Sequence, residues 1–169
     1  MTRRRFSSGL AASVMPAALL VLAGACGESD AAATRLPGVE VEPLLGGPAF
    51  RLDELEGPAV VNLWATWCAP CKRELPDFEA VNRSLAGEVR FVGVNIGDDG
   101  ESAASYLDDL GITYDQYLDA DSELTAALDM ATLPMTLIID VDERIALRHI
   151  GPLDRDQLIT EIDQARGST

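Results

Sequence analysis

The sequence predicts an α/β fold in which helices cover a mixed central sheet. Residues 59–65 and 136–140 are apolar almost throughout and lack the alternation of a half-exposed strand, so each should be a strand buried on both faces. Segments with helical periodicity separate the predicted strands along the chain. Residues 145–150 follow the second buried run after a short turn and should pair with it as a terminal hairpin. We therefore expect a three-layer α/β sandwich.

The first half of the predicted domain is a hairpin, the central strand and a long helix. Residues 39–45 and 50–52 flank a Gly-Gly-Pro turn and should form the hairpin. Pro76 lies inside the helical pattern that follows the central strand, so it should kink that helix after its first turn, and Gly87 should end it. The apolar face of this helix is predicted to consist of Leu75, Phe78, Val81 and Leu85.

The second half alternates strands and helices and contains an extra helix and strand over residues 102–118. Gly111 should end the first helix of this half, and Asp121 or Ser122 should cap the next one. Asp154 and Gln157 have the spacing of a capping box at the start of the last helix. The full set of expected elements is strands at 89–96, 112–118, 136–140 and 145–150 and helices at 102–110, 121–130 and 154–166.

Composition and charge favour a folded, acidic protein. The chain has 169 residues, of which 47% are hydrophobic, enough for one domain and a targeting segment. Its formal net charge is −15, and removing the basic leader leaves 10 Lys and Arg against 28 Asp and Glu, or −18. Such a surface repels phosphate backbones and anionic lipid head groups, so we expect no nucleic-acid partner. The acidic surface should chiefly keep the protein in solution.

Residues 1–25 are predicted to be a signal peptide. Three arginines at positions 3–5 form a basic start, and the apolar run over 10–25 is too short to span a membrane. Residues 2–6 also resemble the twin-arginine export motif, so both export routes remain open.

Cys26 is the expected site of lipid attachment. The segment Leu22-Ala23-Gly24-Ala25-Cys26 resembles a bacterial lipobox, although its leucine lies four residues before the cysteine instead of the usual three. Three cysteines leave one unpaired in an oxidising compartment, which favours lipidation over a stray thiol in a periplasmic protein. Residues 26–38 would then be the tether and residues 39–169 the folded domain.

The cysteines Cys68 and Cys71 stand where the central strand becomes a helix. At a helix N-terminus the unpaired N–H groups and the dipole stabilise a thiolate, so Cys68 is the expected nucleophile and Cys71 the resolving thiol. Pro70 restricts the dipeptide between them. The alternatives are a structural disulfide and half of a zinc site. No second Cys pair exists and His149 is the single histidine, so we expect no metal and no cofactor.

At these residues the chain resembles the thioredoxin superfamily over nearly all of residues 39–166. Trp67-Cys68-Ala69-Pro70-Cys71 matches the active-site pattern of that family, and Pro76 matches its helix-kinking proline. Thr132-Leu133-Pro134-Met135-Thr136 lies where the family has a cis-proline loop facing the dithiol. The resemblance implies a cis Pro134, and it implies that the Leu133 backbone pairs with a bound substrate strand.

Within that superfamily the chain is most similar to the TlpA/ResA/DsbE-like group. Asn62 occupies the place of the buried Asp of cytosolic thioredoxins, and Glu74 stands three residues after Cys71. The N-terminal hairpin and the extra helix and strand over residues 102–118 also fit this group of extracytoplasmic oxidoreductases, many of which serve cytochrome c maturation. The resemblance implies that Glu74 accepts a proton from Cys71; the alternative is a solvated acid that favours the helix dipole.

These observations predict a protein thiol–disulfide oxidoreductase on the extracytoplasmic face of the bacterial membrane. Its partners would be protein dithiols or disulfides and a membrane redox partner, and we expect a monomer. Trp67, Ala69, Pro70 and Leu133 should face the substrate, with Trp67 also shielding the dithiol and Trp64 lying in the core. The sequence leaves reductant and oxidant open, and the alternatives from other classes are a dithiol metallochaperone and a binding lipoprotein.

Overall fold

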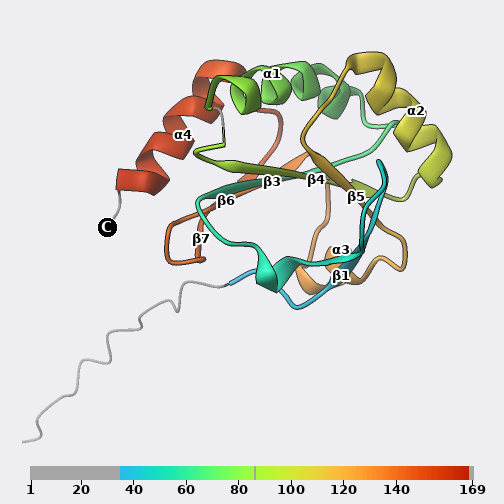
Figure 1. Ribbon diagram of the computed structural model, residues 1–169, viewed down its shortest axis with the longest axis horizontal. Coiled ribbons are helices and arrows are strands. Elements are labelled where there is room, and N and C mark those ends of the chain that lie inside the picture. The colour runs from blue at the N-terminus through green and yellow to red at the C-terminus, as the bar shows by residue number, and fades with distance from the viewer. Residues whose placement is uncertain (1–34, 86, 168–169) are drawn as a thin grey trace, which may run out of the picture.

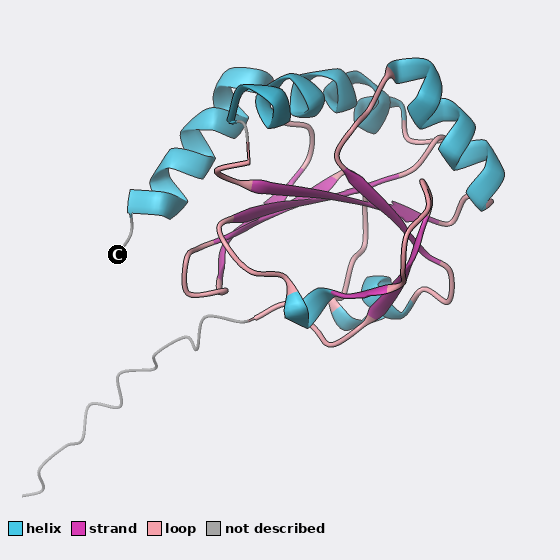
Figure 2. Cartoon of the chain, in the orientation of Figure 1, coloured by secondary structure: helices cyan, strands magenta, loops and turns pink. Residues whose placement is uncertain are grey.

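A seven-stranded mixed sheet separates two helical layers in the computed structural model, which describes residues 35–85 and 87–167 (Figures 1 and 2). The strand order is β2-β1-β5-β4-β3-β6-β7. The strands are β1 Glu40–Pro43, β2 Phe50–Arg51, β3 Ala59–Trp64, β4 Arg90–Ile96, β5 Asp115–Asp119, β6 Met135–Ile139 and β7 Ile145–Ile150. The helices are a 3-10 turn η1 Leu52–Glu54, α1 Ala69–Leu85, α2 Gly100–Leu110, α3 Glu123–Ala127 and α4 Arg155–Gly167.

The central strand β3 explains why the two apolar runs lack alternation. β3 pairs parallel with β4 and antiparallel with β6, and every residue of β3 and β6 is buried. Helices α1, α2 and α4 cover one face of the sheet, while η1 and α3 lie on the other (Figure 1). Two hydrophobic clusters fill these interfaces, so a strand between them contributes apolar side chains to both. The predicted three-layer sandwich is confirmed.

Local capping signals account for the ends of α2 and α4. Asp99 accepts hydrogen bonds from the N–H groups of Glu101 and Ser102, and Gly111 ends α2 in the left-handed conformation. Asp154 and Gln157 form the predicted reciprocal box, with N···O distances of 3.0 and 2.9 Å. Helix α1 runs through Pro76 as one continuous element.

The start of α3 corrects a prediction. Neither Asp121 nor Ser122 caps this helix: the Ser122 backbone is left-handed and its side chain makes no capping bond. Asp119, at the end of β5, instead accepts hydrogen bonds from the N–H groups of Leu124 and Thr125. The helix also spans only Glu123–Ala127, which is shorter than the predicted range of 121–130. Its cap comes from the preceding strand, a position that local capping rules do not examine.

The folded domain begins before the predicted boundary at residue 39. Leu36 is buried and joins the hydrophobic cluster on the α3 face of the sheet. Residues 35–38 therefore belong to the domain and not to a tether. The predicted signal peptide, Cys26 and the rest of the tether lie outside the described residues. Within residues 35–85 and 87–167, no helix is long and apolar enough to cross a membrane.

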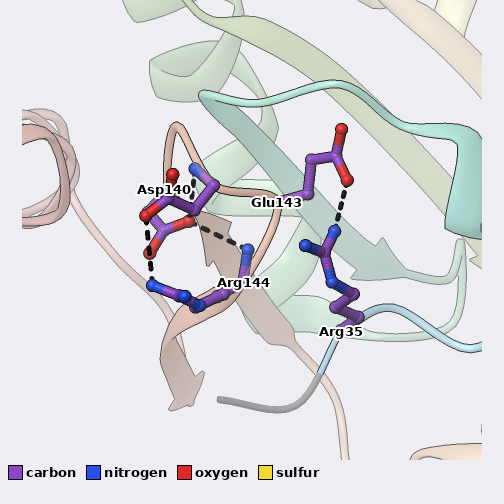
Figure 3. Close-up of polar contacts among 5 residues, drawn as sticks. Arg35, Asp140, Glu143 and Arg144 are labelled. Atoms are coloured by element: carbon purple, nitrogen blue, oxygen red, sulfur yellow. Dashed lines mark hydrogen bonds and ion pairs between the residues drawn. The ribbon is translucent and has the colours of Figure 1, made fainter.

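The β6–β7 turn is organised by the carboxylate of Asp140 (Figure 3). Its Oδ1 accepts hydrogen bonds of 2.9 Å from the N–H groups of Asp142 and Arg144, while Glu143 adopts a left-handed backbone with φ of 63°. Arg35 forms an ion pair with Glu143 and so joins the start of the described chain to this turn. The turn lies beside the start of β3, at the opposite end of the sheet from the residues that follow Trp64.

Candidate active site

Cys68 and Cys71 form a disulfide at the junction of β3 and α1. Cys68 is 5% exposed and Cys71 is fully buried, so Cys68 is the sulfur nearer to a partner. The N–H of Cys71 points at the Cys68 sulfur across 3.2 Å. Once the disulfide opens, this donor and the positive end of α1 stabilise a thiolate on Cys68. The geometry therefore supports Cys68 as nucleophile and Cys71 as resolving thiol.

Glu74 lies in α1 three residues after Cys71 and is 2% exposed. Its Oε1 accepts a hydrogen bond of 2.9 Å from Asn62 Nδ2 on β3, and its Oε2 accepts one of 3.1 Å from the Leu153 N–H. Burial raises the pKa of Glu74 to about 7, and these two hydrogen bonds oppose that rise. The alternative of a solvated acid is wrong, because the side chain is enclosed.

A surface pocket of about 240 Å³ reaches Glu74 from the side of α4. Its lining residues come from α1, from the segment that leads into α4 and from the first turn of α4: Arg73, Glu74, Asp77, Pro152, Leu153, Asp154 and Gln157. Glu74 is one of these lining residues, although it is 2% exposed. Glu74 therefore lies on the dithiol helix α1, next to a hollow at the protein surface.

The peptide bond between Leu133 and Pro134 is cis, as the resemblance implied. The register of β3 with β6 places Leu63 opposite Met135, so the loop before β6 lies at the same end of the sheet as Cys68. Pro134 is buried, its carbonyl accepts a hydrogen bond from the Gly151 N–H, and Leu133 is half-buried. The pairing of the Leu133 backbone with a substrate stays a prediction.

The two tryptophans occupy different environments. Trp64 is fully buried, as predicted, and donates from Nε1 to Gln116 Oε1 at 3.0 Å. Trp67 is 66% exposed, so most of its indole faces solvent beside the disulfide. Ala69 is also exposed and Pro70 is half-exposed. Trp67 is thus better placed to contact a partner than to shield the sulfurs.

Asp98 is a residue near the disulfide that the sequence did not single out. Its carboxylate accepts hydrogen bonds from the Thr66 N–H and hydroxyl, two residues before Cys68. The available signal was an acid just after the strand predicted at 89–96. This strand is β4, which pairs parallel with β3, and parallel neighbours end at the same edge of a sheet.

His149 lies on β7, half-buried and opposite Thr136 of β6. In the part of the chain that the structure describes, no three His, Cys, Asp or Glu side chains gather as a possible metal site. The arrangement at Cys68 and Cys71 is a dithiol with a buried acid behind it, and its chemistry is thiol–disulfide exchange.

Comparisons with known proteins agree with this geometry. The AhpC/TSA family model matches residues 32–148. The thiol:disulfide interchange protein HelX of Rhodobacter capsulatus is 33% identical over 137 residues, covering 79% of this chain and 76% of HelX. The thiol:disulfide interchange protein DsbE of Escherichia coli is 34% identical over 122 residues, covering 63% of this chain and 64% of DsbE.

Among solved structures, a thiol:disulfide interchange protein of the thioredoxin family from Chlorobium tepidum superposes with a TM-score of 0.71 at 26% identity. That similarity covers 81% of this chain and 99% of the other. The chain therefore belongs to the AhpC/TSA family, in the group of thiol–disulfide oxidoreductases that includes HelX and DsbE.

Proposed function

We propose that this protein reduces disulfides in extracytoplasmic proteins and that it serves cytochrome c maturation, held at the membrane by a lipid on Cys26. The single observation that carries the redox chemistry is the buried carboxyl of Glu74, three residues after the resolving Cys71 and bonded to Asn62. The basic leader and the cysteine at its end support the location. The similarity to HelX and DsbE supports the reaction class.

The first chemical step is attack by the Cys68 thiolate on a substrate disulfide. A bond forms between the Cys68 sulfur and one substrate sulfur, and the substrate bond breaks to release a thiolate that takes a proton from water. The Cys71 N–H, 3.2 Å from the Cys68 sulfur, favours the attacking thiolate. The exposed Trp67 and the loop at Leu133 provide the surface against which the substrate would lie.

The second step resolves the mixed disulfide. Cys71 gives its proton to Glu74 and attacks the Cys68 sulfur, which releases the second substrate thiolate and leaves the Cys68–Cys71 disulfide. A carboxyl with a pKa of about 7 suits this task, because it is partly ionised near neutral pH and can still hold the proton it receives. The pocket lined in part by Glu74 would be the route of that proton to solvent. A dithiol on a membrane redox partner then supplies two electrons and restores the reduced enzyme.

The decisive experiment uses an oxidised peptide with the CxxCH motif, the site of c-type haem attachment. Reduced wild-type protein should reduce the peptide, Cys68→Ser should be inactive, and Cys71→Ser should accumulate a mixed disulfide with it. Reduction by both variants at the wild-type rate would rule out the proposed chemistry. A glutathione titration fixes the direction: a potential near that of the strong oxidant DsbA, about −120 mV, would favour a dithiol oxidase instead.

The proposed anchor has its own test. The wild-type protein should partition into detergent and carry a lipid mass on its N-terminal peptide, whereas Cys26→Ser should lose both. An unmodified wild-type peptide that begins elsewhere would reject the anchor and leave the redox proposal intact.

A further inference from the structure

The segment that carries the nucleophile is a tight turn between β3 and α1. The Cys68 N–H donates to the Ala65 carbonyl at 3.2 Å, so Thr66 and Trp67 are the two central residues of the turn. No regular element contains them. The position of the Cys68 sulfur over the helix terminus therefore depends on what holds this turn.

Asp98, two residues after the end of the neighbouring strand β4, holds this turn. The carboxylate accepts from the Thr66 N–H at 2.7 Å and from the Thr66 hydroxyl at 2.6 Å. One side chain thus occupies both donors of the first central residue of the turn.

The Asp98 side chain is itself fixed at the end of β4. Asn95, fully buried, donates from Nδ2 to Asp98 Oδ2 at 2.6 Å, and its own Oδ1 accepts from the Asp98 N–H at 3.3 Å. β4 lies parallel to β3, with Asn95 opposite Trp64. The clamp therefore connects the turn to a rigid part of the sheet and not to a free loop.

We propose that Asp98 is a positioning residue for the redox reaction, clamping the turn at Thr66 so that Cys68 stays over the start of α1 after the disulfide opens. In the oxidised protein the bond to Cys71 already restrains Cys68. Reduction removes that restraint, and the clamp then keeps the Cys68 sulfur within reach of the Cys71 N–H. With Thr66 fixed, the next side chain, Trp67, projects to solvent beside the nucleophile. The contribution of the clamp to catalysis depends on the proposed function, whereas its effect on the Cys68 thiolate does not.

A pair of substitutions at Thr66 tests the clamp without changing charge. Thr66→Val keeps the shape of the side chain and removes the hydroxyl donor, leaving the N–H bond to Asp98. Thr66→Ser keeps the hydroxyl and removes the methyl group. We expect Thr66→Val to slow disulfide exchange about tenfold, since small misplacements of reacting groups cost one to two orders of magnitude. It should also raise the pH at which half of Cys68 is thiolate, measured by ultraviolet absorbance. Thr66→Ser should restore both quantities.

Asp98→Ala removes the acceptor of both bonds from Thr66. Asp99→Asn is the control for the loss of one acidic charge at this end of the sheet. Asp99 is the next residue and an acid of the same charge, but it caps α2. Asp98→Ala should show the Thr66→Val effects at least as strongly, because it removes the bonds to both the N–H and the hydroxyl of Thr66. The double variant should be no worse than Asp98→Ala, because no contact with Asp98 is then left for Thr66→Val to break. Asp99→Asn should match the wild type. The equilibrium constant with glutathione should shift about tenfold in Asp98→Ala and Thr66→Val, which corresponds to about 30 mV toward a more reducing potential.

Two results would overturn the clamp: a wild-type thiolate titration in Thr66→Val, or an equal defect in Thr66→Ser and Thr66→Val. If Asp98→Ala does not fold, the Thr66 pair decides alone, since neither substitution changes the charge. The thiolate titration needs no substrate. It therefore separates failure of the clamp from failure of the proposed function, which would appear as a wild-type protein that reduces no peptide.

Discussion

Asn62 Nδ2 lies 2.9 Å from Glu74 Oε1, so the strand before the disulfide and the helix after it share a hydrogen bond in the interior. Both residues are almost completely buried. A buried carboxyl loses hydration when it ionises, and this loss raises the pKa of Glu74 to about 7 against the opposing hydrogen bonds. The acid is therefore neutral and charged in comparable amounts near neutral pH, and several measurable consequences depend on that balance.

Replacing Glu74 with Gln should change how stability depends on pH. The pKa of Glu74 in the folded protein, about 7, exceeds the ordinary value of 4.5. The contribution of this acid to the free energy of unfolding is therefore most favourable below about pH 4.5, where the carboxyl is neutral in both states. This contribution to stability falls as pH rises from 4.5 to 7, and above pH 7 it changes little. Relative to wild type, Glu74→Gln should gain on the order of 3 kcal/mol across this window.

The measurement is urea unfolding of the oxidised proteins at several pH values. Gln has one acceptor for two donors, which adds a constant offset, so the slope between pH 4.5 and 7 is the quantity to compare. The exposed Glu56→Gln reports any general effect of removing one acidic charge. A difference between Glu74→Gln and wild type that stays flat with pH would contradict the raised pKa.

Asn62→Leu should raise the pKa of Glu74 above its present value. The Asn62 amide favours the ionised carboxylate, and leucine of similar size removes that donor while leaving the Leu153 contact. The infrared carbonyl band of protonated Glu74 follows this titration directly. It is identified as the band that is missing from the spectrum of Glu74→Gln. A band that titrates at the wild-type pH or lower would show that the hydrogen bond does not tune the acid.

Much of the fold could be predicted because its signals are local. The apolar run of β3, the glycine after α2 and the box of Asp154 with Gln157 each identify an element from a few neighbouring residues. Asp119 capping α3 and Asp98 clamping Thr66 could not be predicted in this way. Asp119 lies five positions before Leu124, outside the positions that the capping rules cover. Asp98 and Thr66 are 32 positions apart, so only the folded sheet brings them together.

The site was predictable in its residues more than in its contacts. Cys68, Cys71, Glu74 and Pro134 were identified by spacing and resemblance, and the structure brings them to one end of the sheet. That Asn62 bonds to Glu74 depends on how β3 packs against α1, which sequence spacing does not specify. Likewise, the exposure of Trp67 depends on the turn that presents it.

Gly93→Ala should destabilise the protein through Gln116. A methyl group at position 93 would lie 2.1 Å from Gln116 Oε1, so the amide must move and give up its hydrogen bond from buried Trp64. We expect a loss of about 1–3 kcal/mol from the unsatisfied group. Gly100→Ala is the matched control: its nearest contacts are ordinary at 3.6 Å, and alanine in α2 should be neutral or stabilising by about 1 kcal/mol. Equal unfolding midpoints for the two variants would contradict the predicted clash.

Trp67→Ala and Trp64→Ala should separate substrate contact from core packing. Trp67 is 66% exposed, so its removal should change the free energy of unfolding by no more than about 0.5 kcal/mol. The same substitution should raise KM for an oxidised peptide several-fold, because an exposed indole beside Cys68 offers apolar contact area at low entropic cost. Trp64 is fully buried, so Trp64→Ala should cost roughly 3–5 kcal/mol. Urea unfolding and peptide kinetics on both variants measure the two effects. A large loss of stability in Trp67→Ala with an unchanged KM would assign that side chain to the core instead of the substrate surface.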